Sequence, residues 1–320
     1  MEIELLYDVF QEEIPIPIAP YGDDIENQQI KVKKKTYVQN GYLEALNIHE
    51  HGIEVIPNVK TGLKTEDFYN MGNSLDEETT LRKIYYNEIC TIVKNHLKCD
   101  FVCPIPNTHF GNGSVHTVRN LQYALDKYKN AQITGEKYDI YDGGISAPLL
   151  GGIHTDYAST AAFDLENQMV NNIYPSGKED ISRFVLINAW RNISHFPIKQ
   201  DNLALLQPKY VNIDKDLVEV ALTFKNTSVR QYHLNHLNHD KHKWTYFPDI
   251  TKDELLIFKQ WDTDKQYPPF VFHTAFKDQT FKDKTYPARE SIEVRIGCFW
   301  NINKKKSVSS SSSGSSNSKL

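Results

Sequence analysis

Long apolar runs are absent from this 320-residue chain, in which no stretch reaches the ~18 apolar residues of a membrane-spanning helix. The sequence therefore excludes a membrane bundle and predicts no membrane partner. An excess of positive charge is also lacking, because 36 Lys and Arg residues face 41 Asp and Glu residues, for a net charge of −5. Such a chain has no broad basic surface for phosphates, which disfavours nucleic-acid binding.

Cysteine is scarce, and its four positions do not follow the spacing of a zinc site or of a disulfide framework. We expect these cysteines to be free, buried thiols. The N-terminus carries Glu2 and Glu4 and lacks the basic and apolar regions of a secretory signal, so export is not expected.

The composition changes sharply only once, near the end of the chain. Three lysines at 304–306 lead into an almost unbroken serine tract, which has no side chains able to form a core. We therefore predict one folded domain over residues 1–302 and a disordered Ser-rich tail over residues 303–320.

Two kinds of local pattern predict helices. Apolar residues at three- and four-residue steps follow the capping box Ser74–Glu77 and predict a long amphipathic helix that reaches Leu97. The same spacing predicts a shorter helix over 117–128. A second capping box, Thr251–Glu254, predicts a helix over 252–261.

Short β-rich runs separated by Pro, Asn, Asp and Gly dominate the chain after residue 138. The strand candidates are 183–187, 203–206, 217–224, 244–247, 270–272 and 291–299. In the last run apolar residues alternate with Ser291, Glu293 and Arg295, so one face is expected in the core and the other in a wet or functional region. The predicted fold class is mainly β with N-terminal α-helices and a sandwich or jelly-roll core.

The sharpest chemical motif is His154-Thr155-Asp156. In extended backbone, residues two apart project to the same side, so an imidazole and a carboxylate converge as a divalent first-row metal requires. Chance alone yields about one such spacing in a chain with 12 histidines, so the motif needs context. His273, at the end of a predicted strand, could complete a two-His-one-carboxylate triad that leaves coordination positions open.

A carboxylate receptor is predicted downstream, where Arg289 and Ser291 face the same way on a strand. Asn188 and Trp190 also alternate along a strand and either line a pocket or pack in the core. The four histidines from His233 to His242 lie in a polar stretch that resembles a surface loop, which favours ordinary surface residues over a metal site.

These motifs occur in an order that resembles a known family. The segments that carry the resemblance are 43–58, 85–88, His154 to Asp156, 187–191, 242–251, 258–262, 272–276 and 289–295. Together they resemble the cephem-methoxylase and AsaB-type hydroxylase and desaturase family of iron(II)- and 2-oxoglutarate-dependent oxygenases.

The resemblance implies a double-stranded β-helix (jelly-roll) oxygenase domain in which His154, Asp156 and His273 hold Fe(II). It implies that Arg289, helped by Ser291, pairs with the distal carboxylate of the co-substrate 2-oxoglutarate. The implied reaction is hydroxylation or desaturation of a small organic metabolite, with 2-oxoglutarate converted to succinate. Arg191 is a second candidate partner for 2-oxoglutarate, and a buried structural ion pair is its alternative role.

Two other functions remain open from the sequence. One is a non-catalytic metal-binding jelly roll that serves as a binding module. The presence of all the candidate metal ligands and of the candidate carboxylate receptor argues against it. The other is a metal enzyme of the same barrel class that does not use 2-oxoglutarate, which Arg289 pointing away from the metal would favour.

The last three residues, Ser318, Lys319 and Leu320, match the S-K-L peroxisomal address. The flexible serine tract before them would let an import receptor reach them. The sequence therefore predicts a peroxisomal import receptor as a partner and a peroxisomal location, with a cytoplasmic location as the alternative.

Overall fold

A computed structural model describes residues 1–8, 18–20, 31–71, 79–105, 116–134, 145–146, 152–162, 164, 181–224 and 227–301. The predicted tail over 303–320, with its Ser318–Leu320 tripeptide, lies outside these residues, as does the capping box Ser74–Glu77. Within the described ranges, no helix is both long enough and apolar enough to cross a membrane.

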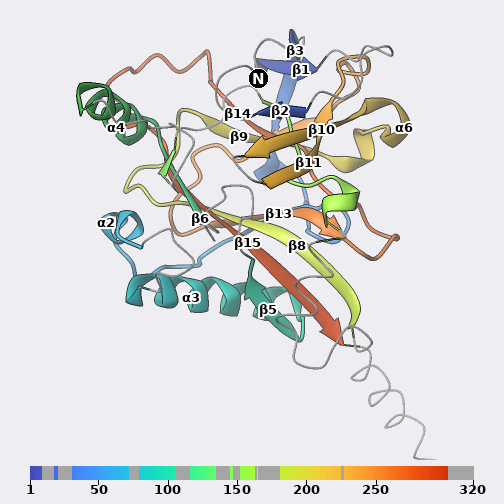
Figure 1. Ribbon diagram of the computed structural model, residues 1–320, viewed down its shortest axis with the longest axis horizontal. Coiled ribbons are helices and arrows are strands. Elements are labelled where there is room, and N and C mark those ends of the chain that lie inside the picture. The colour runs from blue at the N-terminus through green and yellow to red at the C-terminus, as the bar shows by residue number, and fades with distance from the viewer. Residues whose placement is uncertain are drawn as a thin grey trace, which may run out of the picture.

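Helices are few in the described part of the chain, and the strands dominate (Figure 1). The helical elements are η1 (Gly41–Leu43), α2 (Thr65–Tyr69), α3 (Thr80–Leu97), α4 (Leu121–Thr134), η4 (Pro208–Tyr210) and α6 (Ile213–Asp216).

The largest sheet has the strand order β4-β13-β8-β15-β6-β7, with β5 also paired to β15. Its strands are β4 (Ile53–Ile56), β13 (Leu255–Asp262), β8 (Ile181–Asn192), β15 (Glu290–Asn301), β6 (His116–Asn120), β7 (Ile145–Ser146) and β5 (Phe101–Pro104). The long antiparallel pairing of β8 with β15 forms the centre of this sheet.

Two smaller sheets complete the β structure. One has the order β1-β3-β12-β9-β14 and the other has the order β11-β10-β2. Their strands are β1 (Glu2–Asp8), β3 (Lys31–Asn40), β12 (Trp244–Tyr246), β9 (Asn202–Leu206), β14 (His273–Phe276), β11 (Thr227–Leu234), β10 (Leu217–Phe224) and β2 (Ile18–Pro20). Residue His154 bridges both β11, at His233, and β14, at His273, so it joins the two smaller sheets. The result is a nearly closed barrel, consistent with a jelly roll.

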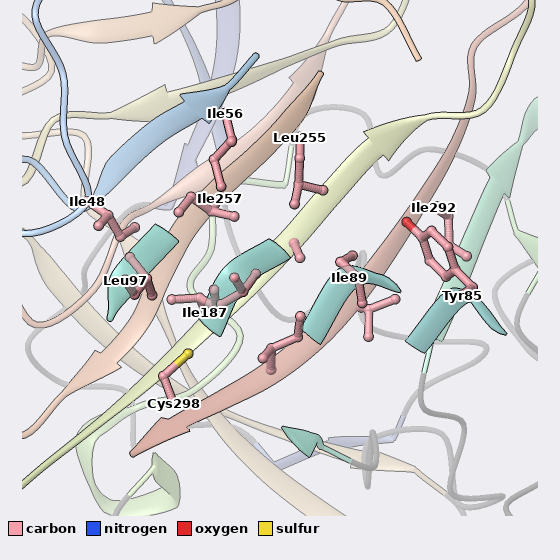
Figure 2. Close-up of a cluster of buried hydrophobic side chains, with 14 of the residues drawn as sticks. Ile48, Ile56, Tyr85, Ile89, Leu97, Ile187, Leu255, Ile257, Ile292 and Cys298 are labelled. Carbon is pink, nitrogen blue, oxygen red and sulfur yellow. The ribbon is translucent and has the colours of Figure 1, made fainter. Parts of the chain in front are cut away.

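Helix α3 covers one face of the large sheet. Its N-cap Thr79 accepts a hydrogen bond from the backbone N–H of Arg82, which fixes where the helix begins. Figure 2 shows Tyr85, Ile89 and Leu97 of this helix meeting apolar side chains of the sheet. These partners include Ile187, Leu255, Ile257, Ile292 and Cys298. Because Ile187, Ala189 and Ile292 point to this face, the residues that alternate with them, such as Asn188 and Ser291, project toward the opposite face.

The predicted helix over 252–261 is wrong, because these residues lead into strand β13. The capping-box bonds do form: both the backbone N–H and the hydroxyl of Thr251 donate to Glu254 Oε2, each at 2.8 Å. They close a turn before the strand rather than begin a helix. β13 then pairs with β4 and β8 and is buried on both faces, and such a continuous apolar run can be mistaken for a helix.

Two other predicted boundaries need correction. Residues 117–120 belong to strand β6, and only from Leu121 does the chain become helical, as α4. The predicted strand over 270–272 lies just before β14, which begins at His273. The other strand candidates coincide with β8, β9, β10, β12 and β15.

Candidate metal and co-substrate site

His154, Asp156 and His273 converge on one point inside the barrel. The backbone N–H of His154 donates to the carbonyl of His273 at 3.2 Å, and that of His273 donates to the carbonyl of His154 at 2.9 Å. This pair of bonds places the two imidazole rings side by side, with centroids 4.4 Å apart. Oδ1 of Asp156 lies 3.7 Å from Nε2 of each histidine, and all three ligand atoms lie within 4.8 Å of one another.

The hydrogen bonds of the two rings direct their Nε2 atoms toward Asp156. His154 Nδ1 lies 2.7 Å from the carbonyl of Gly152, and His273 Nδ1 lies 3.4 Å from the carbonyl of Val271. Since a carbonyl only accepts, Nδ1 donates and the lone pair of a neutral ring is on Nε2. Burial, reinforced by the neighbouring His273, lowers the pKa of His154 to about 3, so its ring is neutral at ordinary pH.

Asp156 is held from three neighbouring strands. Its Oδ2 accepts hydrogen bonds from Asn188 Nδ2 on β8 at 2.8 Å and from Arg295 Nε on β15 at 3.0 Å. Its backbone N–H donates to Gln260 Oε1 on β13 at 2.7 Å. Burial alone would raise the pKa of Asp156, but the guanidinium of Arg295 and the two histidines hold it below its usual range, so the carboxylate is ionised.

Arg289 is a buried cation with incomplete hydrogen bonding. Its Nε donates to Ser291 Oγ at 2.9 Å, its Nη1 donates to the carbonyl of Asp201 at 2.6 Å, and its guanidinium stacks on Trp190 at 5.2 Å. Asp201, whose carbonyl accepts this bond, has a left-handed φ of 52°. No carboxylate among the described residues lies within salt-bridge distance of Arg289, and burial lowers its pKa to about 10 even though the more distant charge of Asp201 acts in the opposite direction.

The large sheet brings this cation to the metal side of the barrel. Ser291 and Arg295 share one face of β15 because they are four residues apart in a strand. Arg295 contacts Asp156, and Ser291 contacts Arg289, so one strand carries contacts to both groups. On the same face of β8, Asn188 contacts Asp156, whereas Trp190 packs in a buried apolar cluster beside Arg289.

Arg191 lies on the other face of β8, against α3. Its Nη1 donates to the carbonyls of Val59 and Lys252 at 2.9 and 3.1 Å, and its Nη2 lies 3.7 Å from Glu88 Oε1. The structure therefore gives Arg191 the contacts of a structural ion pair and does not bring it to the site.

The histidine series that ends at His242 is not a surface loop at either end. His233 is a buried residue of β11 beside His154. His242 is also buried, with Nε2 3.2 Å from Asp216 Oδ2 and its ring stacked on Tyr7. Neither residue belongs to the group of possible metal ligands found among the described residues.

The donor set fits a divalent first-row metal. Two neutral imidazoles and one carboxylate suit a non-haem Fe(II) site of the facial type. Three buried polar atoms around Asp156 also have no hydrogen-bond partner within the described chain: Asn188 Oδ1, Gln260 Nε2 and Arg295 Nη1. Buried polar atoms are normally satisfied, so these three fit a site that bound groups complete.

Comparisons with known proteins bear on this geometry. A family model described as "Oxidoreductase/YMDC permease-like domain" matches residues 18–299. A hydroxylase/desaturase, EfuI of Hormonema carpetanum, is 27% identical over 70% of this chain and 72% of its own. An alpha-ketoglutarate-dependent dioxygenase, TstK of Talaromyces stipitatus, is 22% identical over 79% of each chain.

The fold also has a solved counterpart. The structure of an iron and alpha-ketoglutarate-dependent endoperoxidase, NvfI, superimposes with a TM-score of 0.70 and 20% sequence identity. The match covers 94% of this chain and 98% of that one. Since the identity is low, this likeness establishes the fold alone.

Proposed function

Because the chain belongs to the oxidoreductase/YMDC permease-like domain family, we propose that it is an iron(II)- and 2-oxoglutarate-dependent oxidoreductase of a small organic molecule. The names of its relatives support this activity, since alpha-ketoglutarate is 2-oxoglutarate. One observation carries the proposal: strand β15 links a two-His-one-carboxylate group to a buried arginine that has no carboxylate partner in the described chain.

In this proposal His154, Asp156 and His273 hold Fe(II) through two Nε2 atoms and Oδ1. Arg289 receives the distal carboxylate of 2-oxoglutarate, and the hydroxyl of Ser291 keeps the guanidinium in place. A buried cation without a carboxylate is unfavourable for folding, which is the pattern expected of a residue kept for a ligand.

When bound, Fe(II) supplies the oxidative decarboxylation of 2-oxoglutarate by O₂ to succinate and CO₂, coupled to oxidation of the substrate. The protein's own residues bind and orient. The carbonyls that accept from the histidine Nδ1–H groups fix the two rings, and buried side chains such as Phe258, 5.0 Å from the ring of His273, keep water from that side.

The motif order further supports placing the chain with the cephem-methoxylase and AsaB-type enzymes, whose reactions are hydroxylations and desaturations. The relative named as a hydroxylase/desaturase agrees with this narrower assignment.

The test is binding followed by turnover. Titration calorimetry with Mn²⁺ should show 2-oxoglutarate binding only when the metal is present, and His273→Ala should abolish it. With Fe(II) and O₂, a substrate screen should then yield succinate. Binding of 2-oxoglutarate without the metal, or no binding at all, would contradict the proposal. Metal-dependent binding without succinate from any substrate would instead favour the non-catalytic binding module.

We also propose that Ser318–Leu320 directs peroxisomal import when Leu320 is the last residue of the chain, on the strength of the S-K-L match. A fluorescent protein fused to the N-terminus should be punctate in cells and become diffuse when Leu320 is deleted. An unchanged distribution after the deletion would favour the cytoplasmic alternative.

A further inference from the structure

The carboxylate of Asp156 is bound asymmetrically. Oδ2 accepts hydrogen bonds from Asn188 Nδ2 at 2.8 Å and from Arg295 Nε at 3.0 Å, and Arg295 Nη2 forms an ion pair with the same oxygen at 2.9 Å. An arginine usually places its two donors on the two oxygens of a carboxylate. Here both arginine nitrogens lie against the same oxygen, and the two hydrogen bonds to Oδ2 use its two lone pairs.

The other oxygen faces the two histidines. Oδ1 lies 3.7 Å from Nε2 of both rings, whereas the contacts with Asn188 and Arg295 are made by Oδ2. A carboxylate held in this way can bind a metal through Oδ1, whereas Oδ2 would first have to give up its hydrogen bonds.

The sheet register builds this arrangement. Arg295 on β15 and Asn188 on β8 are directly opposite each other in the antiparallel pairing, so their side chains start from neighbouring points on one face. On the next strand the pairing of β13 with β8 shifts between Lys259 and Trp261, and Gln260 at this bulge holds the backbone N–H of Asp156. Side chain and backbone of Asp156 are thus fixed from three adjacent strands.

We infer that Arg295, assisted by Asn188, is a positioning residue that makes Asp156 a single-oxygen metal ligand. This inference rests on the proposed function and deepens it. By occupying Oδ2, the two side chains keep the carboxylate from closing on the metal with both oxygens, and so they preserve the open positions that a co-substrate and oxygen need.

Arg295→Gln removes the charged hydrogen bond and the ion pair to Asp156, and Asn188→Ala removes the amide donor. Loss of such a partner of a metal ligand typically weakens metal affinity by about 10- to 100-fold. We expect Arg295→Gln to fall within that range and Asn188→Ala to lose less. Arg295→Lys keeps one charged donor and should recover part of the loss.

A matched control is available in the same sheet. Arg183 on β8 donates from Nε to Asp262 Oδ1 on β13 at 2.9 Å and pairs with Oδ2 through Nη2, but neither residue touches the metal triad. Arg183→Gln therefore breaks an arginine–aspartate pair of similar burial and should leave metal affinity at the wild-type value.

The measurement uses the full chain and Co²⁺, which binds such sites without reacting with oxygen. Titration calorimetry gives the affinity, the Co²⁺ visible spectrum reports coordination number, and circular dichroism checks folding. We expect weaker binding and a changed spectrum for Arg295→Gln, with smaller changes for Asn188→Ala. Wild-type affinity and spectrum in whichever of the two variants folds would overturn the inference while leaving the proposed function intact. Failure of the wild-type protein to bind Co²⁺ would instead overturn the proposed function itself.

Discussion

Replacing Arg289 with methionine should weaken 2-oxoglutarate binding while changing stability little. Methionine is of similar length but carries no charge. The guanidinium has a hydrogen bond to Ser291, a hydrogen bond to the carbonyl of Asp201, and no carboxylate partner in the described chain. Its spare donors are therefore the ones available to a ligand.

The stability change follows from two opposing contributions. Burial lowers the pKa of Arg289 from 12.5 to about 10, which corresponds to about 3 kcal/mol of unfavourable charge burial. Losing two hydrogen bonds costs about 1 kcal/mol each. These contributions nearly cancel, so the free energy of unfolding should stay within about 2 kcal/mol of the wild-type value.

Binding has no such compensation. A charge-assisted hydrogen bond is worth about 1.5–3 kcal/mol, and every 1.4 kcal/mol is tenfold in affinity. Loss of one bond to the distal carboxylate therefore raises the dissociation constant of 2-oxoglutarate by about 10- to 150-fold. Calorimetry with Mn²⁺ present measures this constant, and urea unfolding measures stability.

Arg191→Met is the comparison that separates the two roles. It removes the donor to two carbonyls and the cation beside Glu88 Oε1, so it should destabilise the protein by about 3 kcal/mol without changing the 2-oxoglutarate affinity of the folded fraction. If Arg289→Met bound 2-oxoglutarate with wild-type affinity, the assignment of Arg289 would be refuted and Arg295 would become the next candidate.

Three further predictions concern stability. His116 is buried with a folded-state pKa lowered to about 4, so the unfolded chain takes up the proton first, and unfolding free energy should fall by up to about 3 kcal/mol between pH 6.5 and 4. His116→Gln should flatten this pH dependence in urea titrations, and an unchanged slope would contradict it. Gly52→Ala places a side chain at a φ of 71°, with its Cβ 2.8 Å from Val271 Cγ2, so the free energy of unfolding should fall by at least 1 kcal/mol. A melting temperature equal to that of the wild type would contradict this expectation. Mn²⁺ at 100 times its dissociation constant should stabilise the wild type by about 2.7 kcal/mol in thermal melts. Asp156→Asn should lose this gain, and an equal gain in the variant would show that Asp156 is not a ligand.

The sequence predicts the candidate site residues better than it predicts the residues that hold them in place. His154 and Asp156 can be singled out because their spacing is local and a later strand histidine and arginine give it context, and the structure brings both residues together with His273. Gln260, which accepts a hydrogen bond from Asp156, cannot be singled out, because the capping box before it predicts a helix and gives its side chain no predictable neighbour. Only the pairing of β13 with β8 brings it to Asp156.

Arg295 illustrates a different limit. Alternation along residues 291–299 places it on the functional face, and the structure agrees. Alternation cannot give its partner, because the contact with Asp156 spans 139 positions and depends on how the sheets close. The prediction for Arg191 shows the same limit. Its position beside Trp190 in the chain suggests the site, but neighbouring residues in a strand face opposite sides of the sheet, so Arg191 points away from it.

The pairing of β15 with β8 continues without a register shift from Ser291 to Trp300, and this unbroken pairing fixes the distance between residues along the strand. Arg289 and Arg295 are six residues apart, about 20 Å of extended chain, and no loop between them can absorb a change. Deleting a single residue in this interval would turn Arg295 toward α3 and send an apolar side chain to Asp156. Variation among enzymes built on this plan should therefore collect in the connections around the barrel, while the number of residues between these two arginines stays constant.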